Sequence, residues 1–140
     1  MREILFRGKF GNEWKYGFLS IEPKGLVIKE PYKNESSNMW HIDADTVGQC
    51  TGLKDENGKK IFEGDILKAD VFKNLKRYKA VWTVEYKERF SQGNGYYFYG
   101  KNRRFNVRAT QSTIINTHAT VIGNLHDNPE LIEVENNDKL

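Results

Sequence analysis

Cysteine, proline and long apolar runs are scarce in this sequence. Its 140 residues include one cysteine, Cys50, and three prolines. A single cysteine cannot form an intramolecular disulfide, which indicates a reducing compartment. No apolar run approaches the roughly 20 residues that cross a bilayer, and Arg7 and Lys9 interrupt the apolar start too early for a signal peptide. We therefore expect a cytoplasmic protein with no membrane contact.

Motifs for common enzyme chemistries are missing as well. The chain has no G-x-x-x-x-G-K-[ST] phosphate loop, and none of its serines lies in a G-x-S-x-G context. Cys50 lies in an apolar segment between Gly48 and Gly52, without an obvious cationic neighbour, so a buried structural thiol is predicted there. The sequence therefore predicts no catalytic residue and no cofactor.

The charge is small overall but unevenly distributed. The formal net charge is +3, and residues 127–140 hold five acidic residues against one lysine, a balance of −4. The preceding residues therefore carry +7, a sign that suits nucleic acid without requiring it. Hydrophobic residues make up only 38% of the chain, but aromatic residues reach 13%. Because each large ring buries much area, a modest aromatic core is feasible.

Apolar and polar residues alternate in many short segments, which is typical of half-buried strands. The alternation is clearest in residues 80–87, where Trp82 and Val84 lie opposite Val81 and Thr83. One short helix is predicted near Pro129, followed by a frayed acidic tail. The sequence therefore predicts a mostly β fold, either a small barrel or a sandwich. Its predicted strands are residues 4–6, 14–18, 25–30, 39–42, 66–72, 80–87, 96–100 and 119–122, with a further strand starting at 61–62.

The most position-specific stretch runs from Thr46 to Lys68. Residues 55–58, Asp-Glu-Asn-Gly, give a strong turn signal, because Asp suits the first position of a type I turn and Asn-Gly tolerates positive φ. Gly64-Asp65 then changes the direction of the chain and begins another strand. Turn geometry explains the glycines of this stretch better than a phosphate loop does. If the chain has two lobes, we expect their seam near residues 43–56.

His41, Asp43 and Asp45 form an H-x-D-x-D motif, and spacing of two places the three side chains on one strand face. A metal-dependent hydrolase is conceivable there, with His126 as a further ligand. In the competing interpretation both aspartates bond backbone amides in a turn. A metal site requires a second ligand cluster with defined geometry, and only His126-Asp127 is a candidate for it. We therefore predict no metal site.

Basic and aromatic residues are combined in the second half of the chain. Small β-barrels bind single strands by stacking bases on exposed rings within a positive groove. That mode requires the rings of residues 96–99 to face outward. In the competing interpretation one face of these rings packs in the core and the charges keep loops soluble. The candidate nucleic-acid-binding residues are Lys73, Lys76, Arg77, Lys79, Arg103, Arg104, Arg108, Tyr97 and Tyr99.

Four segments resemble the YopX family of bacteriophage and prophage proteins. They are REILFRGKF with EWKYGFL, HIDADTVGQCTGLKDENGKKIFEGDIL, AVWTVEY and TVIGNLHDNPELI. Residues 73–116 match only loosely. The resemblance implies a small, mostly β, intracellular protein encoded by a phage or prophage, with no assigned catalytic residue. The matching positions are better explained by turns, caps and packing than by catalysis; they include Gly52, Asp55, Gly58, Gly64, Asp65, Asn124, Asp127 and Pro129.

The F-E-G-D-I segment also resembles the strand entry of SH3-like barrels. We therefore expect one YopX-like domain over residues 1–140. Within it we expect an N-terminal β-hairpin lobe (1–50), a barrel of SH3-like character (56–125) and a short helix with its tail (127–140).

Several functions fit this description. The first hypothesis is a non-enzymatic binding module in the bacterial cytoplasm, whose partner is nucleic acid or a host or phage protein. The alternatives are a homo-oligomeric structural or interaction protein, because exposed strand edges and surface aromatics favour self-association, and a protein that binds single-stranded nucleic acid. A metal-dependent hydrolase ranks last.

Overall fold

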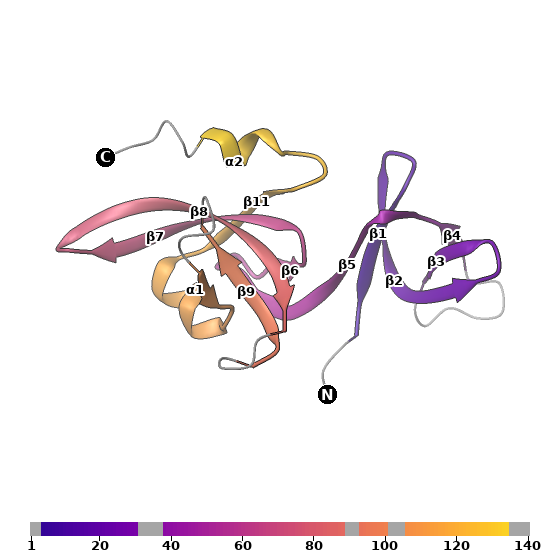
Figure 1. Ribbon diagram of the computed structural model, residues 1–140, viewed down its shortest axis with the longest axis horizontal. Helices are drawn as coiled ribbons and strands as arrows, with labels where there is room; N and C mark the ends of the chain where they lie inside the picture. The colour runs from indigo at the N-terminus through magenta and orange to yellow at the C-terminus, as the bar shows by residue number, and fades with distance from the viewer. Residues whose placement is uncertain (1–3, 31–37, 89–92, 101–105, 135–140) are drawn as a thin grey trace. The chain divides into compact units, whose positions relative to one another are not determined.

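Strands dominate the structure, a computed structural model that describes residues 4–30, 38–88, 93–100 and 106–134. The prediction of a mostly β fold is confirmed (Figure 1). In chain order the elements are β1 (Phe6–Phe10), β2 (Glu13–Glu22), β3 (Gly25–Lys29), β4 (Met39–His41), β5 (Asp43–Lys54), β6 (Lys60–Phe62), β7 (Asp65–Lys73), β8 (Lys76–Lys87), β9 (Gly95–Tyr99), β10 (Asn106–Arg108), α1 (Gln111–Thr117), β11 (Thr120–Asn124) and α2 (Glu130–Val134).

The chain divides into two compact units, residues 1–52 and 53–140. In the first unit, antiparallel strands follow the order β4-β3-β2-β1-β5. The hairpin of β1 and β2 turns at Gly11, whose φ of 64° is in the left-handed region that glycine adopts readily. Strand β5 continues past Gly52, where it neighbours β6.

Apolar side chains from several strands form the buried part of the first unit. Val27 and Ile28 are fully buried, and Ile42 and Cys50 are nearly so. The predicted burial of the Cys50 thiol is therefore confirmed. Gly17 lies where β2 and β3 meet, and a Cβ placed there would be 2.0 Å from the carbonyl oxygen of Lys29. Only glycine permits that approach.

The second unit is built on an antiparallel sheet with the order β10-β9-β8-β7-β11. Among the described strands this sheet is open: β10 and β11 are its two edges. The predicted barrel over residues 56–125 is therefore not closed, and its SH3-like character is not confirmed. Helix α1 lies between β10 and β11 in the chain, and no pairing joins these two described strands.

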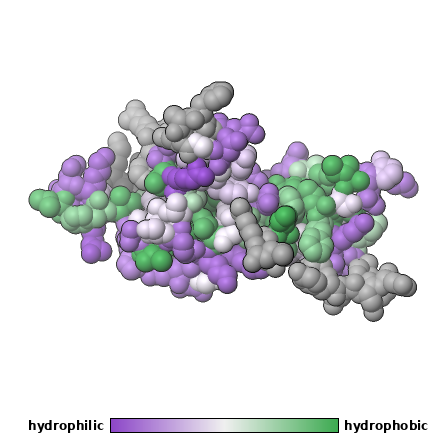
Figure 2. All heavy atoms as spheres, turned by 90° about the horizontal axis from the view of Figure 1, so that it is seen from below, coloured by the Kyte–Doolittle hydropathy of each residue, from purple (hydrophilic) through white to green (hydrophobic). Residues whose placement is uncertain are grey.

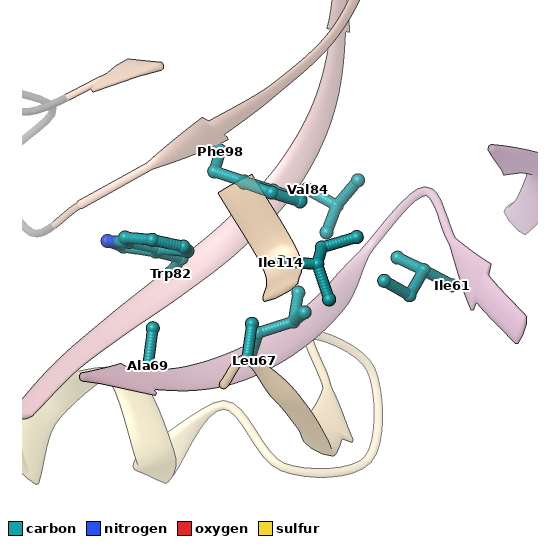
Figure 3. Packing of buried hydrophobic residues seen from close by; sticks show 8 residues of the cluster. Ile61, Leu67, Ala69, Trp82, Val84, Phe98 and Ile114 are labelled. Atoms are coloured by element: carbon teal, nitrogen blue, oxygen red, sulfur yellow. The ribbon is translucent and has the colours of Figure 1, made fainter. Parts of the chain in front are cut away.

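The core of the second unit lies against one face of this sheet (Figure 3). The Trp82 and Phe98 rings stack with centroids 5.3 Å apart and planes 12° from parallel. Ile114 of α1 is fully buried over the same cluster, with Leu67 and Ile61. The strict alternation of β8 places Trp82 and Val84 inside, as the period of two predicts.

Helix α1 was not predicted from the sequence. It has seven residues, QSTIINT, and only Ile114 is buried, so its apolar periodicity is too short to recognise. Local hydrogen bonds define its ends. The Thr110 hydroxyl accepts from the backbone N–H of Thr113 at 3.1 Å, and His118 ends the helix in the left-handed conformation with φ 52°.

The predicted short C-terminal helix is confirmed as α2, which begins directly after Pro129 and contacts β8. Asn124 forms the turn before it, because its side-chain oxygen accepts from the backbone N–H groups of His126 and Asp127 at 3.0 Å each. The Asn128 side-chain oxygen accepts from the backbone N–H of Asn124 at 3.2 Å. It therefore closes the preceding turn.

Candidate functional site

A long two-stranded hairpin of β7 and β8 projects from the second unit (Figure 1). Strand β11 pairs with β7 only over Asp65–Lys68, and β9 pairs with β8 only over Thr83–Lys87. Among the described strands, residues 69–73 and 76–80 therefore pair only with each other, in five register pairs. At about 3.4 Å per residue, this free part of the hairpin is roughly 17 Å long.

The hairpin ends in a two-residue turn, Asn74-Leu75, whose φ angles are 52° and 65°. Two positive φ values between the paired residues Lys73 and Lys76 are typical of a type I′ turn. Asn suits such a turn, but Leu in the left-handed region costs about 1–2 kcal/mol. The Leu75 side chain is 88% exposed, so packing within this chain does not account for Leu at this position.

The free part of the hairpin is basic on both faces. Cross-strand partners share a face, so Lys73 and Lys76 lie on one face, and Arg77 lies on the other face beside Phe72. Like charges directly opposite each other are destabilising, and Lys73 and Lys76 form such a pair at the tip. From Lys68 to Lys79 there are five basic residues and one acidic residue, a balance of +4.

The acidic residue is Asp70, which accepts a hydrogen bond from the Lys79 ammonium. That hydrogen bond, together with the positive charges of Lys79 and Arg77, lowers the pKa of the Asp70 carboxyl below its usual value. The carboxylate is therefore ionised at neutral pH. It offsets part of the positive charge of the hairpin.

A shallow pocket lies where the hairpin meets the end of α1. His118 is part of it, and its Nδ1 is 2.5 Å from Glu56 Oε1. This arrangement combines an arginine, an imidazole and hydroxyl and amide groups beside an apolar ring, a set of groups that suits phosphate and sugar contacts. The pocket is lined by Asp70, Val71, Phe72, Arg77, Asn116, Thr117 and His118.

The predicted stacking role of Tyr97 and Tyr99 requires correction. Their side chains are only 1% and 5% exposed, so their rings cannot stack on bases. Tyr97 donates its hydroxyl to the carbonyl oxygen of Gly93 at 2.7 Å. The Arg108 guanidinium is 5.7 Å from the Tyr97 ring centroid and donates to the carbonyl oxygen of Asn94 at 3.0 Å. Arg108 thus holds a loop, while Arg103 and Arg104 lie outside the described residues.

Exposed aromatic rings on a strand lie in the first unit instead. Tyr16 and Phe18 of β2 are 46% and 44% exposed. Beside them the Arg7 guanidinium carbon is 4.6 Å from the Trp14 ring centroid. Sequence reasoning assigned these residues only to a strand face. The spacing of two, with basic residues on the neighbouring strand β1, is the signal that could have identified this surface.

The turn stretch around Asp55 and Gly64 has a structural role in the second unit. The Asp55 carboxylate is 5% exposed and accepts from three backbone N–H groups, those of Asn57, Lys59 and Val121, at 2.8–2.9 Å. Buried Asp65 accepts from the backbone N–H of Phe62 at 2.8 Å. Positive φ values of 85°, 84° and 90° explain the glycines at 52, 58 and 64.

A metal site finds no support in the part of the chain that the structure describes. No three His, Cys, Asp or Glu side chains there are grouped to hold an ion. Asp43 accepts from the backbone N–H of Asp45 at 3.1 Å, and its carbonyl oxygen accepts from the Thr46 hydroxyl at 2.6 Å. The Asp43 carboxylate thus bonds a backbone amide, as the turn interpretation of the sequence expects for that residue. Over the same described residues, no helix is long and apolar enough to cross a membrane.

These observations define a class: a mostly β protein whose second unit extends a basic hairpin. The chain belongs to the YopX family, because the family model described as YopX protein matches residues 7–133. A crystal structure of protein EF1440 from Enterococcus faecalis is similar, with 24% identity and a TM-score of 0.54. The match covers 94% of this chain and 99% of that one; it supports the fold alone. No curated protein matches.

Proposed function

We propose that this protein is a non-enzymatic nucleic-acid-binding module that uses the β7–β8 hairpin. The observation that carries the proposal is the +4 balance of residues 68–79 on a projecting ribbon. A two-stranded β-ribbon fits the major groove of a duplex, which is about 12 Å wide. Lysine and arginine side chains on both faces of the ribbon would meet phosphates on both sides of a groove. The proposed setting is the bacterial cytoplasm, within a phage or prophage programme.

Replacing Lys76 and Arg77 together by alanine is the direct test. We expect affinity for a fluorescein-labelled 20-base-pair duplex to fall roughly 10- to 100-fold at 100 mM salt, because each residue contributes a charge-assisted phosphate contact. The slope of log K against log salt should become shallower by about 1.8, at about 0.9 per phosphate. Fluorescence anisotropy over a salt series measures both quantities.

The matched control replaces Lys24 and Lys59, two exposed lysines in turns outside the β7–β8 hairpin, by alanine. It removes the same charge and should leave the salt slope unchanged. Wild-type protein that shows no salt-dependent binding to the duplex, to the single strand of the same sequence or to the matching RNA contradicts the proposal. So does a control variant that loses as much affinity as the hairpin variant.

Asp70→Asn should strengthen binding. The substitution removes the one acidic group of residues 68–79, and at a distance of about 7 Å in water its repulsion of a phosphate corresponds to a factor of about three in affinity. Because the pKa of Asp70 is lowered, the gain should be constant between pH 5.5 and pH 8. Anisotropy titrations at both limits check this. A gain present only at high pH would show that another group is responsible.

A second candidate function is self-association through the first unit. Tyr16, Phe18 and Met39 are each 44–48% exposed, and exposed apolar groups of this size favour contacts between copies of a chain. Light scattering over a range of protein concentrations distinguishes this function. A constant monomer mass contradicts it without affecting the hairpin proposal.

A further inference from the structure

Two large apolar side chains stand at the free end of the hairpin. Phe72 is 64% exposed and Leu75 is 88% exposed. Figure 2 shows apolar surface at this end of the second unit, with hydrophilic surface beside it. Basic residues lie directly next to both side chains: Lys73 and Lys76 flank the turn, and Arg77 is the cross-strand partner of Phe72. An apolar end surrounded by positive charge is complementary to a partner with an anionic surface and an apolar interior.

We propose that Leu75, supported by Phe72, inserts between stacked base pairs of double-stranded nucleic acid and kinks the duplex. This inference rests on the proposed function and specifies its target as a duplex with a deformable step. Leu and Phe are among the side chains that wedge base steps apart in architectural proteins. Pyrimidine–purine steps such as TA unstack most easily, so they are the expected sites.

The dimensions of the hairpin permit this insertion. Its free part is roughly 17 Å long at about 3.4 Å per residue, whereas the grooves of a duplex are only about 8 Å deep. The Leu75 tip therefore reaches the base edges while the ribbon still extends outside the groove. Lys73 and Lys76 would then meet phosphates, which removes the repulsion between these opposed lysines.

The turn fixes the direction of the inserting Leu75 side chain, called the wedge below. A two-residue turn between paired strands leaves the tip little freedom, so ordering it on a duplex costs little entropy. Leu75 occupies a position where glycine or asparagine is usual. Its strained conformation is explained if the apolar side chain is needed for insertion between base pairs. Membrane attachment would need a larger apolar area, because binding to a lipid surface scales with buried area, and only Phe72 and Leu75 are large exposed apolar groups on the free hairpin.

Leu75→Gly removes the inserting side chain without disturbing the turn. Glycine accepts the positive φ, so the thermal midpoint should stay equal or rise. The probe is a 24-base-pair duplex with a central TA step, carrying donor and acceptor dyes at its ends or 2-aminopurine at the step. Wild-type protein should increase energy transfer and 2-aminopurine fluorescence. Leu75→Gly should abolish both signals, while affinity changes less than about tenfold because lost burial and avoided unstacking offset each other.

Two further variants complete the test. Leu75→Asn also tolerates the turn but is polar, so it should behave like Leu75→Gly. Leu75→Met keeps an apolar side chain and should retain the bend. If wild-type protein binds the duplex and Leu75→Gly bends it equally, the wedge is wrong and the proposed function stands. If wild-type protein binds no nucleic acid, binds single strands only, or prefers vesicles of anionic phospholipid, the wedge is overturned; the first of these outcomes also overturns the proposed function.

Discussion

Asp55→Ala should lower the free energy of unfolding of the second unit by about 4 kcal/mol. The carboxylate accepts from three backbone N–H groups, and it is 5% exposed. A buried donor left without its partner costs about 1–3 kcal/mol. Two of these donors, in Asn57 and Lys59, define the turn, and the third, in Val121, belongs to strand β11. The substitution should therefore loosen both the turn and the sheet edge.

Urea denaturation followed by circular dichroism measures this loss. Asp45→Ala is the matched control, because Asp45 is exposed and exposed substitutions usually stay within about 0.5 kcal/mol. Asp55→Asn should be intermediate, since its amide can accept from some of the three donors but presents a second donor to the rest. A loss below about 1 kcal/mol for Asp55→Ala would show that water replaces the carboxylate.

Gly17→Ala should destabilise the first unit by about 3 kcal/mol or more. The added Cβ would lie 2.0 Å from the carbonyl oxygen and 2.9 Å from the carbonyl carbon of Lys29. These are backbone atoms of the paired strand, so no side-chain rotation relieves the collision and β2 must separate from β3. Hydrogen exchange with mass spectrometry should show lost protection in both strands.

Gly11→Ala is the graded comparison for this prediction. Gly11 has a positive φ of 64° but nothing within 4 Å of the added Cβ, so it should cost only about 1–2 kcal/mol of backbone strain. Equal costs at the two positions would contradict the collision argument. The same exchange data also test the predicted lobes. Protection that is lost in β2 and β3 but kept in β7 and β8 means that the second unit holds its fold without the first.

The sequence predicted those parts of the fold that depend on local patterns. Alternation identified β8, and turn chemistry identified the Asp55 turn and the entry at Gly64. The sequence-based prediction failed where residues depart from the usual preferences of a turn or a strand. The β7–β8 turn was not predicted and residues 73–79 were assigned to no strand, because Leu75 occupies a position where glycine is usual. The burial of Tyr97 was missed because β9 is covered on both faces, so its two faces cannot be told apart by polarity.

The sequence identified the basic residues 73–79 of the candidate site, but it did not show how they are arranged on the hairpin. Charge composition is visible in any sequence, but the pairing of Phe72 with Arg77 depends on the register of two strands. The exposed Phe72 and Leu75 were assigned no role, since exposure is a property of the folded chain. Membership of the YopX family, by contrast, followed from short segments and was confirmed over residues 7–133.

The hydrogen bond between Asp55 and Val121 has a consequence for synthesis on the ribosome. The turn that presents the carboxylate is complete by Lys59, but the Val121 amide that the carboxylate binds is 66 residues beyond Asp55 in the chain. At about 5–20 residues per second, that amide is made roughly 3 to 13 s after Asp55. During this interval β7 has no strand at the edge that β11 will occupy. The nascent chain therefore exposes an open sheet edge for seconds, and this is the period in which we expect it to need protection from aggregation.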